Sequence, residues 1–116
     1  MSGTSAAAGT LGSERFRLAQ SARDAALSVP GVAGTNAGSL GLFVTAEDKQ
    51  SVDGVVCAAS AEGGYDISLR LICELVPLQG LGERVRREVR RAALASGTRA
   101  HSIDVHIVDI VGEVEG

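Results

Sequence analysis

The sequence predicts a two-layer α+β domain, in which a small, mainly antiparallel sheet carries two helices on one face. From Tyr65 to Leu75 polar and apolar residues alternate, which is typical of a strand with one covered face. After Pro77 the apolar period changes from two to 3.6, so a helix follows the strand and can cover that face. Together with weaker signals elsewhere, these patterns predict the order helix, strand, strand, strand, helix, strand.

The first helix is expected to run from Ser13 to about Val29. Ser13 is a good N-cap, and Glu14 places a negative charge in the first turn, where the helix dipole favours it. Pro30 and Gly31 end the helix, because the residue before a proline avoids the helical region and a glycine permits the chain to reverse.

Three strands are expected between the two helices. A short strand runs from Val32 to Thr35, a buried one from Val55 to Ala59, and the alternating strand follows a glycine turn. Residues 36–54 are interrupted by glycines, and within them we expect an exposed loop at 46–51. The apolar cluster from Leu40 to Val44 is either a strand end or a flap that docks on the core.

The second helix is expected to begin near Pro77 and to end at Gly97. In it, Glu83 and Arg87 form the better-oriented ion pair at spacing i,i+4. A last strand at Ile103 to Ile107 alternates again. The apolar residues of the helix fall in an arc of roughly 120° at 100° per residue; they are Leu78, Leu81, Val85, Val89, Ala92 and Ala93.

Length and composition limit the possible classes of protein. The 116 residues allow one domain, which we place at 13–112, between a disordered tail at 1–12 and an acidic tail at 113–116. No apolar run approaches the roughly 18 residues that span a bilayer, so we expect a soluble, cytoplasmic protein without direct membrane insertion. The net charge of -3 argues against attraction of the whole molecule to nucleic acid.

The two cysteines are expected to be free thiols. Cys57 and Cys73 lie on neighbouring predicted strands, but Cys57 faces Leu69 or Arg70 in the plausible registers. The two sulfur atoms are therefore not opposite one another, and a disulfide is not expected.

No catalytic residues, metal site or cofactor is expected. Neither the cysteines nor His101 and His106 have the spacing of a zinc site. Cys73 points inward, where a thiol is usually inert, and His106 is a surface residue without a converging nucleophile. We therefore predict a non-enzymatic protein without a small-molecule substrate.

The polar side of the second helix is strongly basic and is the predicted partner-binding site. Like charges on one helix face repel, so helix stability does not explain the cluster, whereas an acidic partner would. The candidate residues are Arg84, Arg87, Arg90 and Arg91. Acidic residues near the last strand offer such a surface on a second copy, which predicts a homo-oligomer that assembles head to tail; they are Asp104, Asp109, Glu113 and Glu115.

A KH-like RNA-binding module is the alternative. Residues 31–34, Gly-Val-Ala-Gly, satisfy a GxxG pattern, and a basic helix over a small sheet is similar to such modules. In a KH domain, however, this loop joins two helices, whereas here it leads from Pro30 into a predicted strand. A glycine-rich turn explains the pattern better, and binding to nucleic acid is not expected.

The order of these segments resembles the alkaline-shock, or envelope stress response, protein family of bacteria. The resemblance covers about Phe16 to Ile110. It implies a cytoplasmic scaffold that associates with itself, acts in cell-envelope stress and is held at the inner membrane face by a small membrane-anchored protein. The matching segments are Val29-Pro30-Gly31-Val32, Gly54-Val55-Val56, Tyr65-Asp66-Ile67-Ser68-Leu69, Pro77-Leu78, Val85-Arg86-x-x-Val89, Ser96-Gly97 and Val105-x-Ile107-Val108-Asp109-Ile110.

Overall fold

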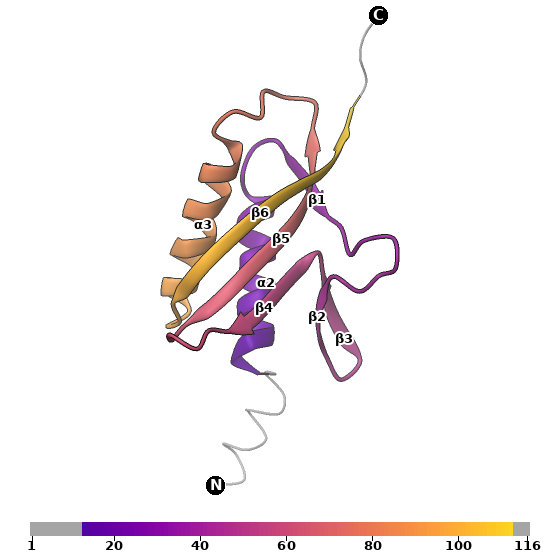
Figure 1. The fold of residues 1–116 in the computed structure, drawn as a ribbon. Coiled ribbons are helices and arrows are strands. Elements are labelled where there is room, and N and C mark those ends of the chain that lie inside the picture. Colours follow the sequence, from indigo (N-terminus) through magenta and orange to yellow (C-terminus); the bar gives the residue numbers. More distant parts are fainter. Residues whose placement is uncertain (1–12, 113–116) are drawn as a thin grey trace, which may run out of the picture.

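The structure, a computed structural model, describes residues 13–112 and confirms the predicted α+β class (Figure 1). Residues 1–12 and 113–116, where the sequence predicts a disordered and an acidic tail, lie outside the described residues. The described elements are, in chain order, α2 (Glu14–Leu27), β1 (Val32–Thr35), β2 (Val44–Glu47), β3 (Gln50–Asp53), β4 (Val55–Ala59), β5 (Tyr65–Glu74), α3 (Leu81–Ala95) and β6 (Ala100–Val111).

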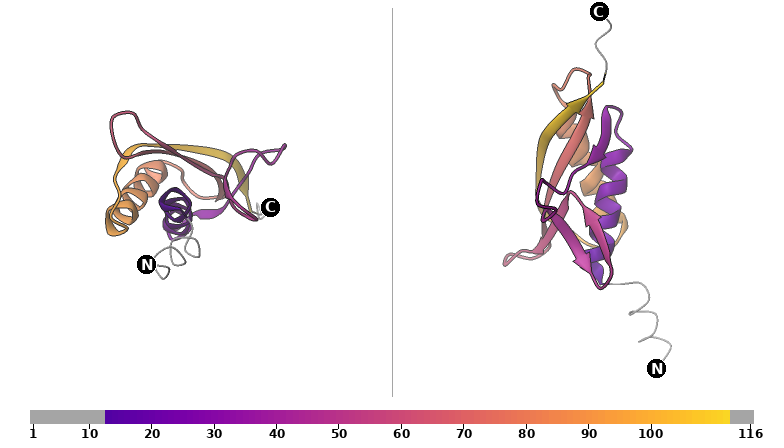
Figure 2. Two further views of the ribbon diagram at one scale, coloured as in Figure 1. Left: turned by 90° about the horizontal axis from the view of Figure 1, so that it is seen from below. Right: turned by 90° about the vertical axis from the view of Figure 1, so that its right-hand side faces the viewer.

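Strand β5 is the centre of a four-stranded sheet. Along one edge it pairs antiparallel with β4 through residues 65–69 and with β1 through residues 71–73. Along the other edge it pairs in parallel with β6. Both helices lie on the same face of this sheet, and α3 packs against both α2 and β6 (Figure 2). The predicted two-layer arrangement is therefore confirmed.

The predicted element order is wrong at residues 36–54, because it omits the hairpin of β2 and β3. These two strands form a separate antiparallel sheet. The segment 46–51, predicted as an exposed loop, includes the tip of this hairpin, where Asp48 turns the chain with φ at 52°. Only Thr45 and Val52 of the eight strand residues are buried, so the alternating signal was too weak to predict strands.

Helix α3 begins at Leu81 and not near Pro77. Gly80 is the N-cap and has a left-handed backbone with φ at 78°. Because this conformation is not helical, the helix cannot extend from Leu81 back toward Pro77. Strand β5 ends at Glu74, so Leu75, predicted on the buried face, is 55% exposed.

The register of β4 against β5 also differs from the prediction. The turn between these strands takes residues 60–64 and is closed by a backbone hydrogen bond across its ends. As a result Cys57 faces Ile67, and neither Leu69 nor Arg70. Both cysteines are free and buried, as predicted.

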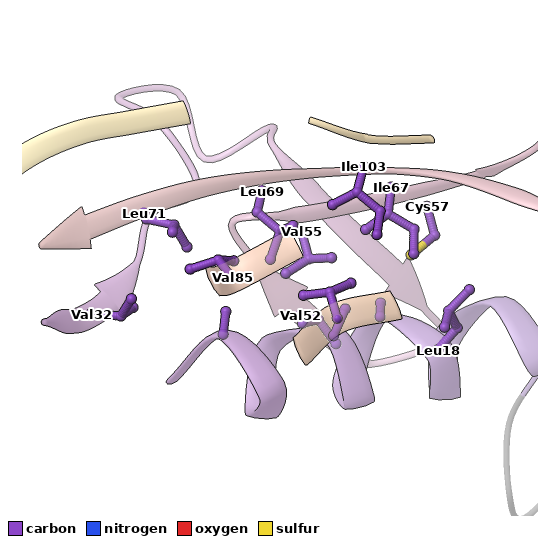
Figure 3. Close-up of a cluster of buried hydrophobic side chains, with 14 of the residues drawn as sticks. Leu18, Val32, Val52, Val55, Cys57, Ile67, Leu69, Leu71, Val85 and Ile103 are labelled. Carbon is purple, nitrogen blue, oxygen red and sulfur yellow. The ribbon is translucent and has the colours of Figure 1, made fainter. Parts of the chain in front are cut away.

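The core lies between the sheet and the two helices (Figure 3). Every second residue of β5 points into it, which confirms the predicted alternation. Helix α3 contributes one residue per turn, and α2 contributes mainly alanines, which allow a close approach. The main contributors are Leu18, Ala22 and Ala26 of α2, Ile67, Leu69, Leu71 and Cys73 of β5, and Leu81, Val85, Val89 and Ala93 of α3.

The start of α2 is tied to the hairpin. The Ser13 hydroxyl accepts the Phe16 N–H at 3.1 Å, which confirms the predicted N-cap. The Ser13 N–H in turn donates to both carboxylate oxygens of Glu47, at 2.9 and 3.0 Å. This hydrogen bond is the main reason that the pKa of Glu47 lies below its ordinary value.

The outer edge of β4 is closed by side chains. The buried Thr45 hydroxyl donates to the Val55 carbonyl at 2.8 Å and accepts the Cys57 N–H at 3.1 Å. Arg15 reaches the Cys57 carbonyl at 3.5 Å. These contacts take the place of a neighbouring strand and block further pairing at this edge.

Replacing Val85 with Asp should destabilise the domain by about 3 kcal/mol or more, because it would bury an unpaired carboxylate in the core. Thermal or urea unfolding followed by circular dichroism measures the effect. Arg87→Asp, on the exposed side of the same helix, is the control and should unfold near the parent. A Val85→Asp melt within a few degrees of the parent would show that the phase of α3 is wrong.

Replacing Thr45 with Val should cost about 1–3 kcal/mol, since it leaves the Val55 carbonyl and the Cys57 N–H buried without their partner. Thr45→Ser keeps the hydroxyl and is the control, expected to lose less stability than Thr45→Val. Urea denaturation of both variants measures the difference. Equal stability of the two would contradict the proposed role of the hydroxyl.

Candidate interaction site

The arginine cluster on α3 follows from how this helix is anchored. Its buried residues recur every fourth position, so one side of the helix faces α2 and the sheet. The arginines occupy the positions between them and are forced to the opposite side. With five arginines and two glutamates, α3 keeps an excess of positive charge.

All four predicted partner-binding residues are exposed on this side of α3; we call them the arginine face. They are Arg84, Arg87, Arg90 and Arg91. Arg91 donates to the Glu88 carboxylate at 3.0 Å, so its charge is partly compensated. The guanidinium groups of the other three form no hydrogen bond or ion pair with any residue from 13 to 112, and they are available for a partner.

The predicted pairing of Glu83 with Arg87 is wrong. Glu83 instead accepts a hydrogen bond from Arg86 at 2.6 Å, three residues further along the helix. This bond is the main cause that lowers the pKa of Glu83, and the charges of Arg86, Arg87 and Arg90 lower it further. Arg87 therefore stays free to bind elsewhere.

The arginine face borders an open depression of about 340 Å³. Leu94, at its rim, is 63% exposed although it is apolar. Guanidinium groups bind carboxylates through paired hydrogen bonds, and an adjacent leucine adds an apolar contact. This combination fits an acidic segment with an apolar side chain. The depression is lined by Glu83, Arg86, Arg87, Arg90, Arg91 and Leu94.

Two of the four acidic residues expected to meet the arginine face are described, and both lie on the other side of the molecule. Asp104 and Asp109 are exposed on β6, on the sheet face that points away from the helices. Glu113 and Glu115 lie outside the described residues. Within one molecule the arginine face and these aspartates therefore cannot neutralise each other.

The cysteines are enclosed and protonated. Burial raises the pKa of the Cys57 thiol to about 11, and burial also raises the pKa of Cys73. Neither is therefore a thiolate at neutral pH. Among residues 13–112, no group of three or more His, Cys, Asp or Glu side chains is arranged to hold a metal ion.

The GxxG segment is not a loop between two helices. Gly31 follows the end of α2, and the next residues form β1, which pairs with the end of β5. The segment is a turn into a strand, as the glycine-turn explanation predicted.

Sequence reasoning missed a second surface, around Arg70. The apolar cluster from Leu40 to Val44 does not dock as a flap on the core, since Leu40 is 80% and Leu42 75% exposed. The centroid of the Phe43 ring lies 5.4 Å from the Arg70 guanidinium carbon. The two residues border an open depression of about 320 Å³. The leucines were visible in the sequence, but their position beside Arg70 of β5 was not.

His101 is the other residue whose surroundings the sequence did not indicate. Its Nε2 lies 2.7 Å from Glu62 Oε1, and its Nδ1 lies 2.8 Å from Asp66 Oδ1. The hydrogen bond with Asp66 is the main reason that the pKa of His101 is raised above 6.5. The imidazole thus joins the turn before β5 and the start of β5 to the start of β6.

Comparison with family models, with curated proteins and with solved structures finds no significant match. In the part of the chain that the structure describes, no helix has the length and apolar character needed to cross a membrane.

Replacing His101 with Gln should lower the melting temperature in mildly acidic buffer and have less effect as the pH rises. Because folding raises the pKa of His101, its protonated form stabilises the fold fully below 6.5, and this contribution is lost as the pH rises through the raised value. Melts of both proteins between about pH 5.5 and 9 measure the difference, which should be small for an exposed group. A difference that stays constant over this range would contradict the ion pairs.

Proposed function

We propose that this chain is a non-enzymatic interaction module whose arginine face binds an acidic surface of another protein. The observation that carries the proposal is that Arg84, Arg87 and Arg90 are exposed together and that their guanidinium groups lack hydrogen-bonding partners within residues 13–112. Such a cluster weakens the helix through repulsion of like charges, so a bound partner is the better explanation for it. The neighbouring exposed Leu94 supports a protein partner in particular, because it offers apolar contact beside the charges.

The partner that we propose is a membrane-anchored protein, which would hold this otherwise cytoplasmic chain at the inner face of the membrane. We further propose that the chain associates with itself and acts as a scaffold in the response to cell-envelope stress. These parts of the proposal rest on the resemblance of the motif order to that of the alkaline-shock family. The arginine face supplies the physical means of recruitment, since a guanidinium group that donates two parallel hydrogen bonds to a carboxylate binds it more strongly than a neutral hydrogen bond does.

Reversing the charge of the arginine face should abolish recruitment without unfolding the domain. We expect Arg87→Glu/Arg90→Glu/Arg91→Glu to keep the helical circular dichroism of the parent, because all three side chains are exposed. In bacterial cells a fluorescent fusion of the parent should lie at the membrane, whereas the triple variant should be diffuse. Arg87→Lys/Arg90→Lys/Arg91→Lys is the matched control and should retain part of the recruitment, since it keeps the charge but loses paired hydrogen bonding.

Binding to single-stranded RNA, measured by fluorescence anisotropy at physiological salt, tests the alternative. We expect no appreciable binding for the parent, because its net charge of -3 opposes attraction to a phosphate backbone. If the triple variant folds and localises like the parent, yet loses RNA binding that the parent shows, the arginine face serves nucleic acid and the scaffold proposal fails.

A further inference from the structure

The outer edge of β6 presents unpaired backbone groups. In β5 the Arg70 N–H donates to Gly54 and its carbonyl accepts from Asn36, so even-numbered residues of β5 bond toward β4 and β1. Odd-numbered residues bond toward β6, as Tyr65 does with Arg99. In a parallel ladder, a residue of β6 that lies directly opposite an odd-numbered residue of β5 points its own N–H and C=O groups away from β5. These outward-pointing residues are Ile103, Val105 and Ile107.

This open segment has defined ends. One irregularity in the pairing with β5 lies between Ala100 and Ser102, and another between Ile107 and Asp109. Beyond the second, the Asp109 carboxylate accepts the N–H of Ile110 at 2.9 Å and so occupies the edge. The regular, unblocked part of β6 is therefore a short stretch centred near Val105. The opposite edge of the sheet, along β4, is closed by side chains instead.

The stretch from Ile103 to Ile107 is complementary to itself. When two copies pair antiparallel about Val105, each Ile103 faces an Ile107 and the two Val105 residues face each other. On the other face of the sheet each Asp104 faces a His106. Both of these side chains are exposed and have no hydrogen-bonding partner within residues 13–112. An imidazole N–H bonds to a carboxylate whether the ring is charged or neutral.

We propose that two copies of this chain pair antiparallel through the outer edges of β6, with a two-fold axis at Val105, and so join their sheets. The outward N–H and C=O groups of three residues per copy would then be satisfied, and the partly exposed Val105 and Ile107 would be covered further. This pairing rests on the self-association in the proposed function, but it differs from the head-to-tail contact predicted from charge. It closes on itself as a dimer, whereas a head-to-tail contact continues into rings or filaments.

Substitutions that change the charge at positions 104 and 106 test the pairing and its register. We expect the parent to be a dimer in sedimentation equilibrium. His106→Asp sets two carboxylates against each other, and Asp104→Lys sets a lysine against a histidine, so each should raise the dissociation constant by about tenfold or more. The double variant Asp104→Lys/His106→Asp should dimerise again, and an equal mixture of the two single variants should form mixed dimers.

The triple glutamate variant of the arginine face separates this inference from the proposed function. It should dimerise like the parent although it is not recruited to the membrane, and His106→Asp should still be recruited although it is a monomer. Circular dichroism confirms that each variant is folded. A parent that stays monomeric, single variants that dimerise like the parent, or loss of the dimer in the triple variant would overturn the pairing through β6.

Discussion

Strand β5 is bonded along both edges and covered on one face, and the rest of the domain is arranged around it. Its odd-numbered side chains form the floor of the core, so both helices must lie on that side of the sheet. Its even-numbered residues bond toward β4 and β1, and its odd-numbered ones toward β6. The apolar side of α3 follows from this constraint, and the position of the arginine face follows from α3. The position of the basic surface thus depends on the alternation in one strand.

The elements that the sequence predicted correctly are those whose own pattern decides their structure. Strand β5 alternates because one face is covered, and α3 has its apolar stripe because one side is buried. The hairpin of β2 and β3 was not predictable in this way, because only Thr45 and Val52 of its strand residues are buried, and the Thr45 hydroxyl is held by hydrogen bonds to β4. The start of α3 and the register of β4 depended on glycine turns, in which the backbone conformation of Gly80 and the length of the turn at 60–64 decide the outcome.

The candidate sites divide along the same line. The arginine face was predictable, since helical spacing alone brings Arg84, Arg87 and Arg91 to one side. The open edge was not predictable, although the alternation of Ile103 to Ile107 was visible, because it depends on which side of β5 the last strand joins. The arginine face lies on the helical layer, whereas the proposed contact between two copies lies along the outer edge of β6 in the sheet. The two proposed contacts, one with a partner and one with a second copy, therefore use different surfaces of the molecule.

The parallel pairing of β5 with β6 also has a consequence for synthesis on the ribosome. Leu69 pairs opposite Val105, and all of α3 is translated between them. At about 5–20 residues per second, an emerging chain displays one unpaired edge of β5 on the order of seconds before β6 arrives. During this interval the exposed edge of β5 is vulnerable to pairing with another nascent chain from the same polysome. On one face of β5 the side chains of Asp66, Ser68 and Arg70 are polar. Polar and charged side chains beside an unpaired edge disfavour pairing with another chain, which limits aggregation before the domain is complete.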